Sequence, residues 1–414
     1  MNITEKIIAK HANLLQVHPG EVVEVAVDWC MANDVTIPLT IALFEQEFKF
    51  DAIANRDKVI FINDHRIPAD DINTAEAHQK IRNFANKYGI KLHERDGVCH
   101  QIMLENYVKP GDLVVAADSH TCSYGSIGAV AIGMGSTDIT AVIGSGKTWL
   151  KVPETIQIVL DGKMPKGVFA KDVILYVVKM LTASGATYKT VEFCGSLIAQ
   201  LSISERFTLC NMVIEVGGKS AMIHPDEITR QYFAHTQVDW NFFNLDQPAT
   251  YAQQIQICVD DLEPQVASPH YVDNVKPISS VQGIAIDQAF LGSCTNGRLD
   301  DLQEAAHFLR GKKVHPGVRL LVTPASVTIY QQALQSGLIQ LFMEAGAIIN
   351  HPGCSTCWGA SQGSLAKGQR MISTANRNFK GRAGSPDSEI YLASPATVAA
   401  SAVAGKIIDP RGDV

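Results

Sequence analysis

The sequence predicts an α/β protein with two or three domains. Apolar runs typical of buried strands alternate with amphipathic segments along the whole chain. The 414 residues, 46% of them hydrophobic, are sufficient for more than one core. Composition changes at two stretches that contain proline, 151–153 and 264–277, and these predict domains 1–153, 154–277 and 278–414.

The predicted elements follow in order along the chain. Strands are expected at 21–27, 58–64, 112–118, 155–162 and 317–325. Helices are expected at 74–88, 170–184, 299–309 and 325–336. Asp28, Asp64 and Asp118 each come directly after an apolar run. Open α/β sheets present polar side chains to a crevice at this position, so we expect the three aspartates to face one site.

The charge and cysteine content exclude several classes of protein. The net charge is −7 and the basic residues are scattered, which gives no footprint for nucleic acid. No run approaches the roughly 20 apolar residues that span a bilayer. Nine cysteines and a start without a charged and then apolar leader predict a cytoplasmic protein with free thiols.

Three cysteines are the main candidates for a metal centre, Cys294 in LGSCTNG and the pair Cys354 and Cys357 in HPGCSTCWG. The pair alone also fits a structural zinc site, a redox dithiol or two buried thiols. The other cysteines offer no second short-spaced pair for zinc, and the flanking Pro, Gly and Trp-Gly indicate a tight loop that can direct N–H groups at sulfur. Three thiolates on a four-iron cluster would leave one iron open as a Lewis acid.

A second motif, at 141–148 (AVIGSGKT), supplies the rival hypothesis of a nucleotide hydrolase. It differs from the phosphate-binding P-loop because Ala141 stands where the motif has Gly. A P-loop also follows a buried strand and opens a long helix. Here a stretch rich in Gly, Ser and Thr precedes the motif and Pro153 follows a few residues later, so the nucleotide interpretation is disfavoured.

Several long segments resemble the aconitase superfamily, most closely large subunits of the isopropylmalate dehydratase and homoaconitase type. The segments are 61–68 (FINDHRIP), 97–138, 210–218 (CNMVIEVGG), 291–302 (LGSCTNGRLDDL) and 373–410. The resemblance covers nearly the full length and implies three α/β domains around a 4Fe-4S cluster. It places the cluster on Cys294, Cys354 and Cys357, with one open iron that takes the hydroxyl and a carboxylate of a small hydroxy acid.

The acid and base groups expected in such a site are carboxylates paired with imidazoles. Removing a carbon-bound proton and expelling hydroxide requires both a base and an acid. By likeness to the family, the catalytic pairs are Asp64 with His65, Asp118 with His100, and Glu215 with His120. A lone histidine is more often an ordinary surface or core residue, and only the set inside matching motifs favours catalysis. His65 is the candidate for the proton donor to the leaving hydroxyl.

Five further residues are expected to bind substrate. Arg377 and Arg382 in ANRNFKGR offer planar guanidinium groups that match a carboxylate, with Asn376 and Asn378 on either side of Arg377. The alternative for these arginines is a solvated basic loop. Ser119 and Asn211 resemble family positions near substrate and cluster. Asn33 stands where related chains have His or Gln, and Tyr124 and Trp358 are further departures beside the site.

The resemblance also implies a partner. Single-chain aconitases have a fourth, mobile domain with the serine base and additional arginines, and no such domain fits before Val414. We therefore expect a separate small subunit to complete the site. The expected reaction is the isomerisation of 2- and 3-isopropylmalate by dehydration and rehydration, with homoaconitase or another 2-substituted malate hydro-lyase as the alternative. A non-catalytic iron-sensing or RNA-binding relative is disfavoured because every acid–base position is filled.

Overall fold

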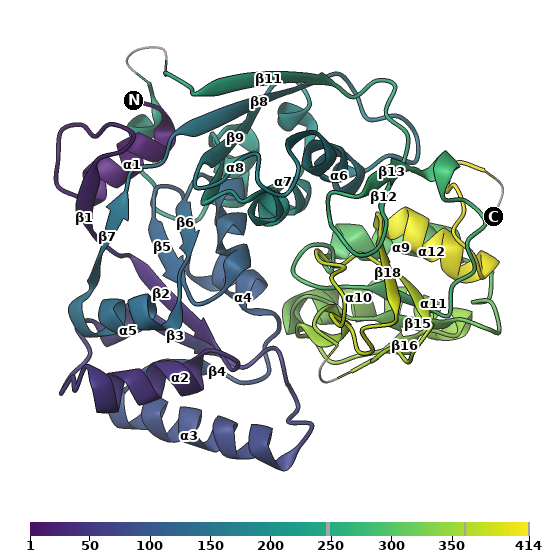
Figure 1. The fold of residues 1–414 in the computed structure, drawn as a ribbon, viewed down its shortest axis with the longest axis horizontal. Helices are drawn as coiled ribbons and strands as arrows, with labels where there is room; N and C mark the ends of the chain where they lie inside the picture. The colour runs from purple at the N-terminus through teal and green to yellow at the C-terminus, as the bar shows by residue number, and fades with distance from the viewer. Residues whose placement is uncertain (246–248, 360–361, 413–414) are drawn as a thin grey trace.

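The computed structural model describes residues 1–245, 249–359 and 362–412 as an α/β protein. Its strands form three sheets of four to seven strands and one two-stranded ribbon. Three groups of helices and strands surround a common centre, with the first at the left, the second at the top and the third at the right of Figure 1. No helix among the described residues is both long and apolar enough to cross a membrane.

The first sheet has five parallel strands in the order β4-β3-β2-β5-β6. They are β4 (Lys91–His93), β3 (Val59–Ile62), β2 (Trp29–Asn33), β5 (Leu113–Ala116) and β6 (Val130–Gly133). The residues of β3 and β5 are buried on both faces, as continuous apolar strands of a parallel sheet must be. The associated helices are α1 (Ile3–His11), α2 (Ile37–Ala42), α3 (Ile72–Tyr88), α4 (Cys99–Asn106) and α5 (Ser136–Ser145).

The second sheet is also parallel, in the order β10-β9-β8-β11. Its strands are β10 (Ser220–Ile223), β9 (Thr190–Cys194), β8 (Thr155–Asp161) and β11 (Gln253–Cys258). The helices of this region are α6 (Ala170–Leu181), α7 (Ile203–Asn211) and α8 (Glu227–Tyr232). The Asp172 carboxylate accepts a hydrogen bond from the backbone N–H of Phe169, which fixes the first turn of α6.

The third sheet has seven strands in the order β13-β12-β18-β17-β14-β15-β16. They are β13 (Val275–Pro277), β12 (Gln265–Ala267), β18 (Glu389–Leu392), β17 (Arg370–Ser373), β14 (Gln288–Leu291), β15 (Arg319–Val322) and β16 (Ile348–Ile349). The helices are α9 (Leu299–Leu309), α10 (Val327–Gln335), α11 (Leu338–Ala345) and α12 (Pro395–Ala404). β12 and β13 come from the stretch 264–277, and β12 pairs antiparallel with both β13 and β18. The third sheet therefore includes strands that precede residue 278, the predicted start of the third domain.

The predicted strands and helices are present, with ends that differ by a few residues. The motif at 141–148 belongs to the end of α5 and the start of β7 (Lys147–Lys151), which pairs with β1 (Val22–Ala26). Gly146 ends the helix in the left-handed conformation, with φ 73°. Gly144 thus lies within a helix and a strand follows Gly146, which is the reverse of a P-loop and excludes the nucleotide interpretation of this motif.

The prediction that Asp28 faces the same site as Asp64 and Asp118 is wrong. Asp28 lies at the amino end of β2, whereas the other two follow the carboxyl ends of β3 and β5. These strands are parallel, so the two ends belong to opposite edges of the sheet. The Asp28 carboxylate accepts hydrogen bonds from His11 Nε2 at 2.6 Å and from the Leu113 N–H at 3.0 Å. Its function is structural.

Candidate active site

The candidate active site is a pocket of about 230 Å³ where the carboxyl ends of strands from two sheets meet. Twelve of the residues singled out in the sequence line it: Asn33, His65, His100, Asp118, Ser119, His120, Cys294, Cys354, Cys357, Trp358, Arg377 and Arg382. Asp64, Asn211 and Glu215 are behind this lining, and each is hydrogen-bonded to a residue that forms it. The structure therefore brings every predicted site residue to one place.

The first carboxylate–imidazole pair is held by a residue that the sequence analysis did not identify. His65 Nδ1 donates to Asp64 Oδ1 at 2.7 Å. The buried Asp34 carboxylate accepts from the backbone N–H groups of residues 64, 65 and 66 at 3.3, 3.0 and 2.9 Å. Burial would lower the pKa of His65, but the charge and hydrogen bond of Asp64 raise it to about 10. The ring is thus held protonated at the edge of the pocket.

Asp118 is the centre of the second pair. Its Oδ1 accepts from His100 Nε2 at 2.9 Å and from the His120 backbone N–H at 2.9 Å. Burial would raise the pKa of Asp118, but the charges and hydrogen bonds of the two histidines lower it well below the ordinary value. The Tyr124 hydroxyl is 3.1 Å from His100 Nδ1, so both nitrogens of this buried ring have partners. These contacts fix the tautomer and orientation of His100.

Asn33 supports Asp118. Its Nδ2 donates to Asp118 Oδ2 at 3.1 Å. Its Oδ1 accepts from the backbone N–H groups of Val35 and Thr36 at 3.2 and 3.3 Å and from the Thr36 hydroxyl. Both ends of the amide are engaged within the chain, so Asn33 orients a carboxylate as well as lining the pocket.

The third pair connects the first and second regions, and Arg377 joins it from the third. Glu215 lies in the 3₁₀ turn Met212–Val216 that follows α7, and its Oε1 accepts from His120 Nε2 at 2.9 Å. Arg377 Nε donates to the same oxygen at 2.8 Å. Burial would raise the pKa of Glu215, but His120 and Arg377 lower it below the ordinary value. One carboxylate thereby positions both an imidazole and a guanidinium group.

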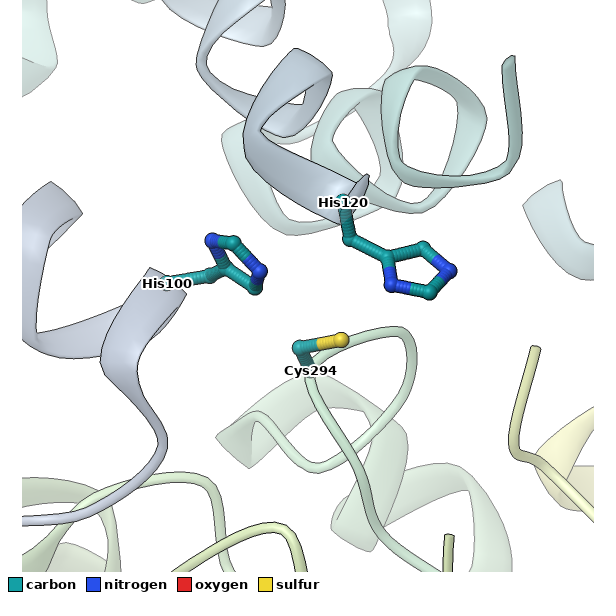
Figure 2. Close-up of side chains that lie close together, drawn as sticks. All are labelled: His100, His120 and Cys294. Carbon is teal, nitrogen blue, oxygen red and sulfur yellow. The ribbon is translucent and has the colours of Figure 1, made fainter. Parts of the chain in front are cut away.

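Figure 2 shows His100, His120 and Cys294 converging from three different segments. All three are buried, and their ligand atoms lie within 4.8 Å of one another. The two imidazole rings are 6.3 Å apart between centroids and are nearly perpendicular. Asp118 and Glu215 each bind one nitrogen of these rings, whereas the sulfur atom of Cys294 is a soft donor suited to a metal cluster.

The thiol-bearing loops have unusual backbone conformations. Ser293 and Ser355, each adjacent to a cysteine of the set, have positive φ values of 76° and 50°. Such conformations are costly for residues other than glycine and concentrate at functional sites. A Cβ on Gly353 would lie 2.8 Å from the carbonyl oxygen of Asp64, which accepts the Cys354 N–H at 2.7 Å. This close approach ties the second thiol loop to the Asp64–His65 turn.

Nitrogen donors lie beside two of the three sulfur atoms, those of Cys294 and Cys357. Asn211 Nδ2 and Asn376 Nδ2 are 3.3 and 3.4 Å from Cys294 Sγ. Arg382 Nη2 is 3.7 Å from Cys357 Sγ, and Arg382 Nε donates to the carbonyl of the same cysteine. A hydrogen bond from Cys354 lowers the pKa of Cys357 well below its usual range, and Arg382 adds to this effect against burial. Such donors favour thiolate, which is the form that binds metal.

The donor set fits an iron–sulfur cluster. Cys294, Cys354 and Cys357 are free, buried thiols that line one pocket. The amide and guanidinium N–H groups are suited to stabilise cluster sulfur atoms. The same pocket is lined by His65, His100, Asp118 and His120 of the carboxylate–imidazole pairs. This combination is suited to acid–base chemistry beside a metal centre.

Comparison with known proteins identifies the family. The model of the aconitase family (aconitate hydratase) matches residues 5–283 and 274–405. A relative from a Hydrogenobaculum strain, described as a 3-isopropylmalate dehydratase large subunit, is 48% identical, and the match covers 99% of this chain and 97% of the relative. A protein of the same description from Aquifex aeolicus is 47% identical, with the same coverage of both chains. The chain belongs to the aconitase family.

Two further comparisons bear on the fold and the substrate question. A protein from Methanothermobacter thermautotrophicus described as a probable methanogen homoaconitase large subunit is 45% identical over 99% of this chain and 98% of its own. The crystal structure of Thermococcus kodakaraensis aconitase X (holo-form) aligns with a TM-score of 0.52 and 14% identity, covering 86% of this chain and 84% of that one. The predicted α/β fold of the aconitase type and the prediction of a hydro-lyase are confirmed.

Proposed function

We propose that the chain is the cluster-bearing large subunit of a 3-isopropylmalate dehydratase. It would interconvert 2- and 3-isopropylmalate by removing and re-adding water. The observation that carries this proposal is the near-complete similarity to large subunits of that description, together with a site in which three thiols and three carboxylate–imidazole pairs share one pocket. The nine free cysteines suit the reducing cytoplasm.

Each group of the pocket has a proposed task. When bound to the three cysteines, a 4Fe-4S cluster would supply one iron without a protein ligand, which acts as a Lewis acid toward the hydroxyl and a carboxylate of the substrate. His65, protonated beside Asp64, donates its proton to the leaving hydroxyl group. The exposed parts of Arg377 and Arg382 bind substrate carboxylates, because a guanidinium group matches a carboxylate with two hydrogen bonds.

The remaining pairs keep the proton-transfer groups in place. Asp118, held by Asn33, sets the orientation of His100, and Glu215 sets that of His120. Ser119 and Asn211 support the pocket from the substrate side and the thiol side respectively. We propose three α/β units with joints at 151–153 and in the stretch 264–277, whose strands β12 and β13 already belong to the third sheet.

The base that removes the carbon-bound proton is proposed to come from a separate small subunit, with further arginines. The description of the relatives as large subunits supports a partner of this kind. The isolated chain is therefore expected to bind the cluster and to turn over poorly. Full activity of this chain purified alone would refute the split site.

The substrate's side group is the least constrained part of the proposal, and homoaconitase is the second candidate because of the relative from Methanothermobacter. Trp358 and Val35 provide apolar surface in the pocket. The Trp358 ring packs edge-on to the His65 imidazole, with centroids 5.8 Å apart. This places a bulky aromatic side chain beside the proposed proton donor and favours a compact branched side group.

The test is anaerobic reconstitution with iron and sulfide, followed by assay with the small subunit against isopropylmalate, homoaconitate and other 2-substituted malates. We expect the highest kcat/KM for isopropylmalate. Cys354→Ser should abolish turnover, whereas Cys258→Ser, at an exposed thiol on β11, should leave turnover unchanged. Binding of zinc in place of an iron–sulfur cluster, or full activity of Cys354→Ser, would contradict the proposal.

A further inference from the structure

Lys171 is a buried lysine that the proposed reaction does not use. It lies in the first turn of α6, in the second region of the fold, and is 1% exposed. Its ammonium group donates to the carbonyl oxygens of Thr374 and Ala375, both at 2.8 Å. No ion pair joins it to a carboxylate within the described parts of the chain. Burying a lysine against neutral carbonyl groups is costly, so the contact calls for a reason.

The loop that Lys171 holds is the one that reaches the thiols. Residues 374–377 follow directly after β17 and include Asn376 and Arg377. Asn376 Nδ2 is 3.4 Å from Cys294 Sγ, and its Oδ1 is 3.5 Å from Cys357 Sγ. Arg377 Nε donates to Glu215. One backbone segment therefore carries a contact to two proposed cluster ligands and a contact to a proposed catalytic carboxylate.

The other thiol loop is held in the same way. The buried Arg298 donates from Nη1 to the carbonyl oxygen of Cys294 at 2.8 Å and is also hydrogen-bonded to the carbonyl of Thr295. Its guanidinium group packs over the Phe207 ring, 4.9 Å from the centroid. Each of these two loops is thus fixed through its backbone carbonyls by a basic side chain. The Thr374 hydroxyl connects them, because it donates to the Gly292 carbonyl at 3.0 Å.

We propose that Lys171 is a positioning residue for the cluster: by holding the carbonyls of Thr374 and Ala375, it keeps the Asn376 amide against the cysteine sulfur atoms. The inference rests on the proposed function, because it assumes that these thiols carry an iron–sulfur cluster. Hydrogen bonds to sulfur raise the reduction potential of such a cluster, since they stabilise the more electron-rich state. Releasing the loop should therefore lower the potential and weaken retention of the cluster.

The burial of Lys171 is consistent with this task. Burial lowers its pKa to about 7, while the nearby thiols of Cys357 and Cys294 act in the opposite direction. A side chain of this length also spans from α6 to the third sheet without a backbone rearrangement. An apolar side chain has no donor for the two carbonyl groups, so neither contact would form with it.

The experiment compares Lys171→Met, Asn376→Ala and the double variant in the reconstituted full chain. Lys179→Met is the matched control, because Lys179 is exposed on the same helix. We expect Lys171→Met and Asn376→Ala to shift the midpoint potential to more negative values and to speed loss of iron to a chelator by about 10-fold or more. The double variant should be no worse than Asn376→Ala, because both changes remove the same contact. Lys171→Arg should change the midpoint potential and the rate of iron loss less than Lys171→Met does.

A second measurement separates this inference from the proposed function. Hydrogen exchange of the cluster-free chain should be faster at residues 374–378 in Lys171→Met than in the wild type or in Lys179→Met. A wild-type chain that takes up no cluster would defeat the proposed function, while the exchange data would still decide whether Lys171 holds the loop. Unchanged exchange, an unchanged potential, or additive effects in the double variant would overturn the inference.

The remaining outcome concerns folding. If Lys171→Met does not fold, the same measurements are made on Lys171→Gln, which retains a donor for one carbonyl. Failure of both variants to fold, with Lys179→Met folded, would assign Lys171 to folding alone and would also overturn the inference.

Discussion

Asp34 is predicted to hold the turn that presents His65, and replacing it with asparagine tests this directly. The buried carboxylate accepts three successive backbone N–H groups, and His78 Nε2 lies 3.4 Å from its Oδ2. Burial would raise the pKa of Asp34, but the hydrogen bond of His78 and the charge and backbone contacts of the turn lower it from 3.8 to about 2. This difference corresponds to roughly 2 kcal/mol of stabilisation at neutral pH.

Asp34→Asn removes this charge and places an amide N–H₂ where Oδ2 accepts the Arg66 N–H. A buried donor left without an acceptor costs a further ~1–3 kcal/mol. We therefore expect a total loss of about 3–5 kcal/mol, which is about 150-fold to 5000-fold faster hydrogen exchange at residues 64–66. Turnover of the reconstituted enzyme should fall as well, because the His65 turn is no longer fixed.

The effect should depend on pH with a defined sign. A carboxylate whose pKa is lowered in the folded protein stabilises it above the unfolded value and loses this effect as pH falls through the folded value. The difference in exchange between wild type and Asp34→Asn should be complete above about pH 4 and should shrink as pH falls toward 2. Unchanged exchange at residues 64–66 at neutral pH would show that the carboxylate does not hold the turn.

Asp28→Asn is a matched control for this experiment. The hydrogen bond from His11 lowers the pKa of Asp28 to about 2 as well, against the effect of burial. Asp28 contacts His11 and Leu113 at the opposite edge of the same sheet. Asp28→Asn should therefore be less stable than the wild type over the same pH range and should show faster hydrogen exchange near residue 113. Hydrogen exchange at residues 64–66 and turnover should be unaffected.

Three further predictions concern the walls of the pocket. Gly353→Ala should reduce the iron bound per chain, because its Cβ would lie 2.8 Å from the Asp64 carbonyl oxygen, whereas Gly135→Ala, with no neighbour closer than 3.9 Å, should bind iron normally. Tyr124→Phe should lower stability in chemical denaturation by about 1–3 kcal/mol, because the buried His100 Nδ1 loses its partner; an unchanged denaturation midpoint would count against this contact. Trp358→Ala should raise kcat/KM for longer side groups relative to isopropylmalate, and an unaltered ratio would show that Trp358 does not limit the side group.

The grouping of the candidate site residues in one pocket was largely predictable from the sequence, since short motifs carry these residues. Asp64 and Asp118 follow apolar strands, and the positions of parallel strand ends make their convergence predictable. The same rule failed for Asp28 because β1 pairs with β7 in a separate ribbon, so that Asp28 begins a strand of the main sheet. Pattern alone identifies a strand end but not which sheet edge it occupies.

The supporting residues could not be predicted, because their roles depend on contacts between segments far apart in the chain. Asp34 follows β2, and no residue near it in the sequence indicates that its carboxylate binds a turn. This function is visible only once the turn at 64–66 lies beside it. Asn33 resembled a substrate ligand, and the structure also commits its amide to Asp118 and Thr36. Strand order is equally non-local, as the pairing of β12 with β18 across more than a hundred residues illustrates.

The distribution of contacts around the thiols bears on the division of labour with a second subunit. The amide and guanidinium groups that face the sulfur atoms come from Asn211, Asn376 and Arg382, and all three belong to this chain. They are contributed by the second and third regions of the fold, so these regions must pack together before the thiols acquire their partners. If the proposed function holds, we therefore expect this chain to assemble and hold the cluster by itself. We expect the proposed partner to complete the pocket on the side where Arg377 and Trp358 remain partly exposed.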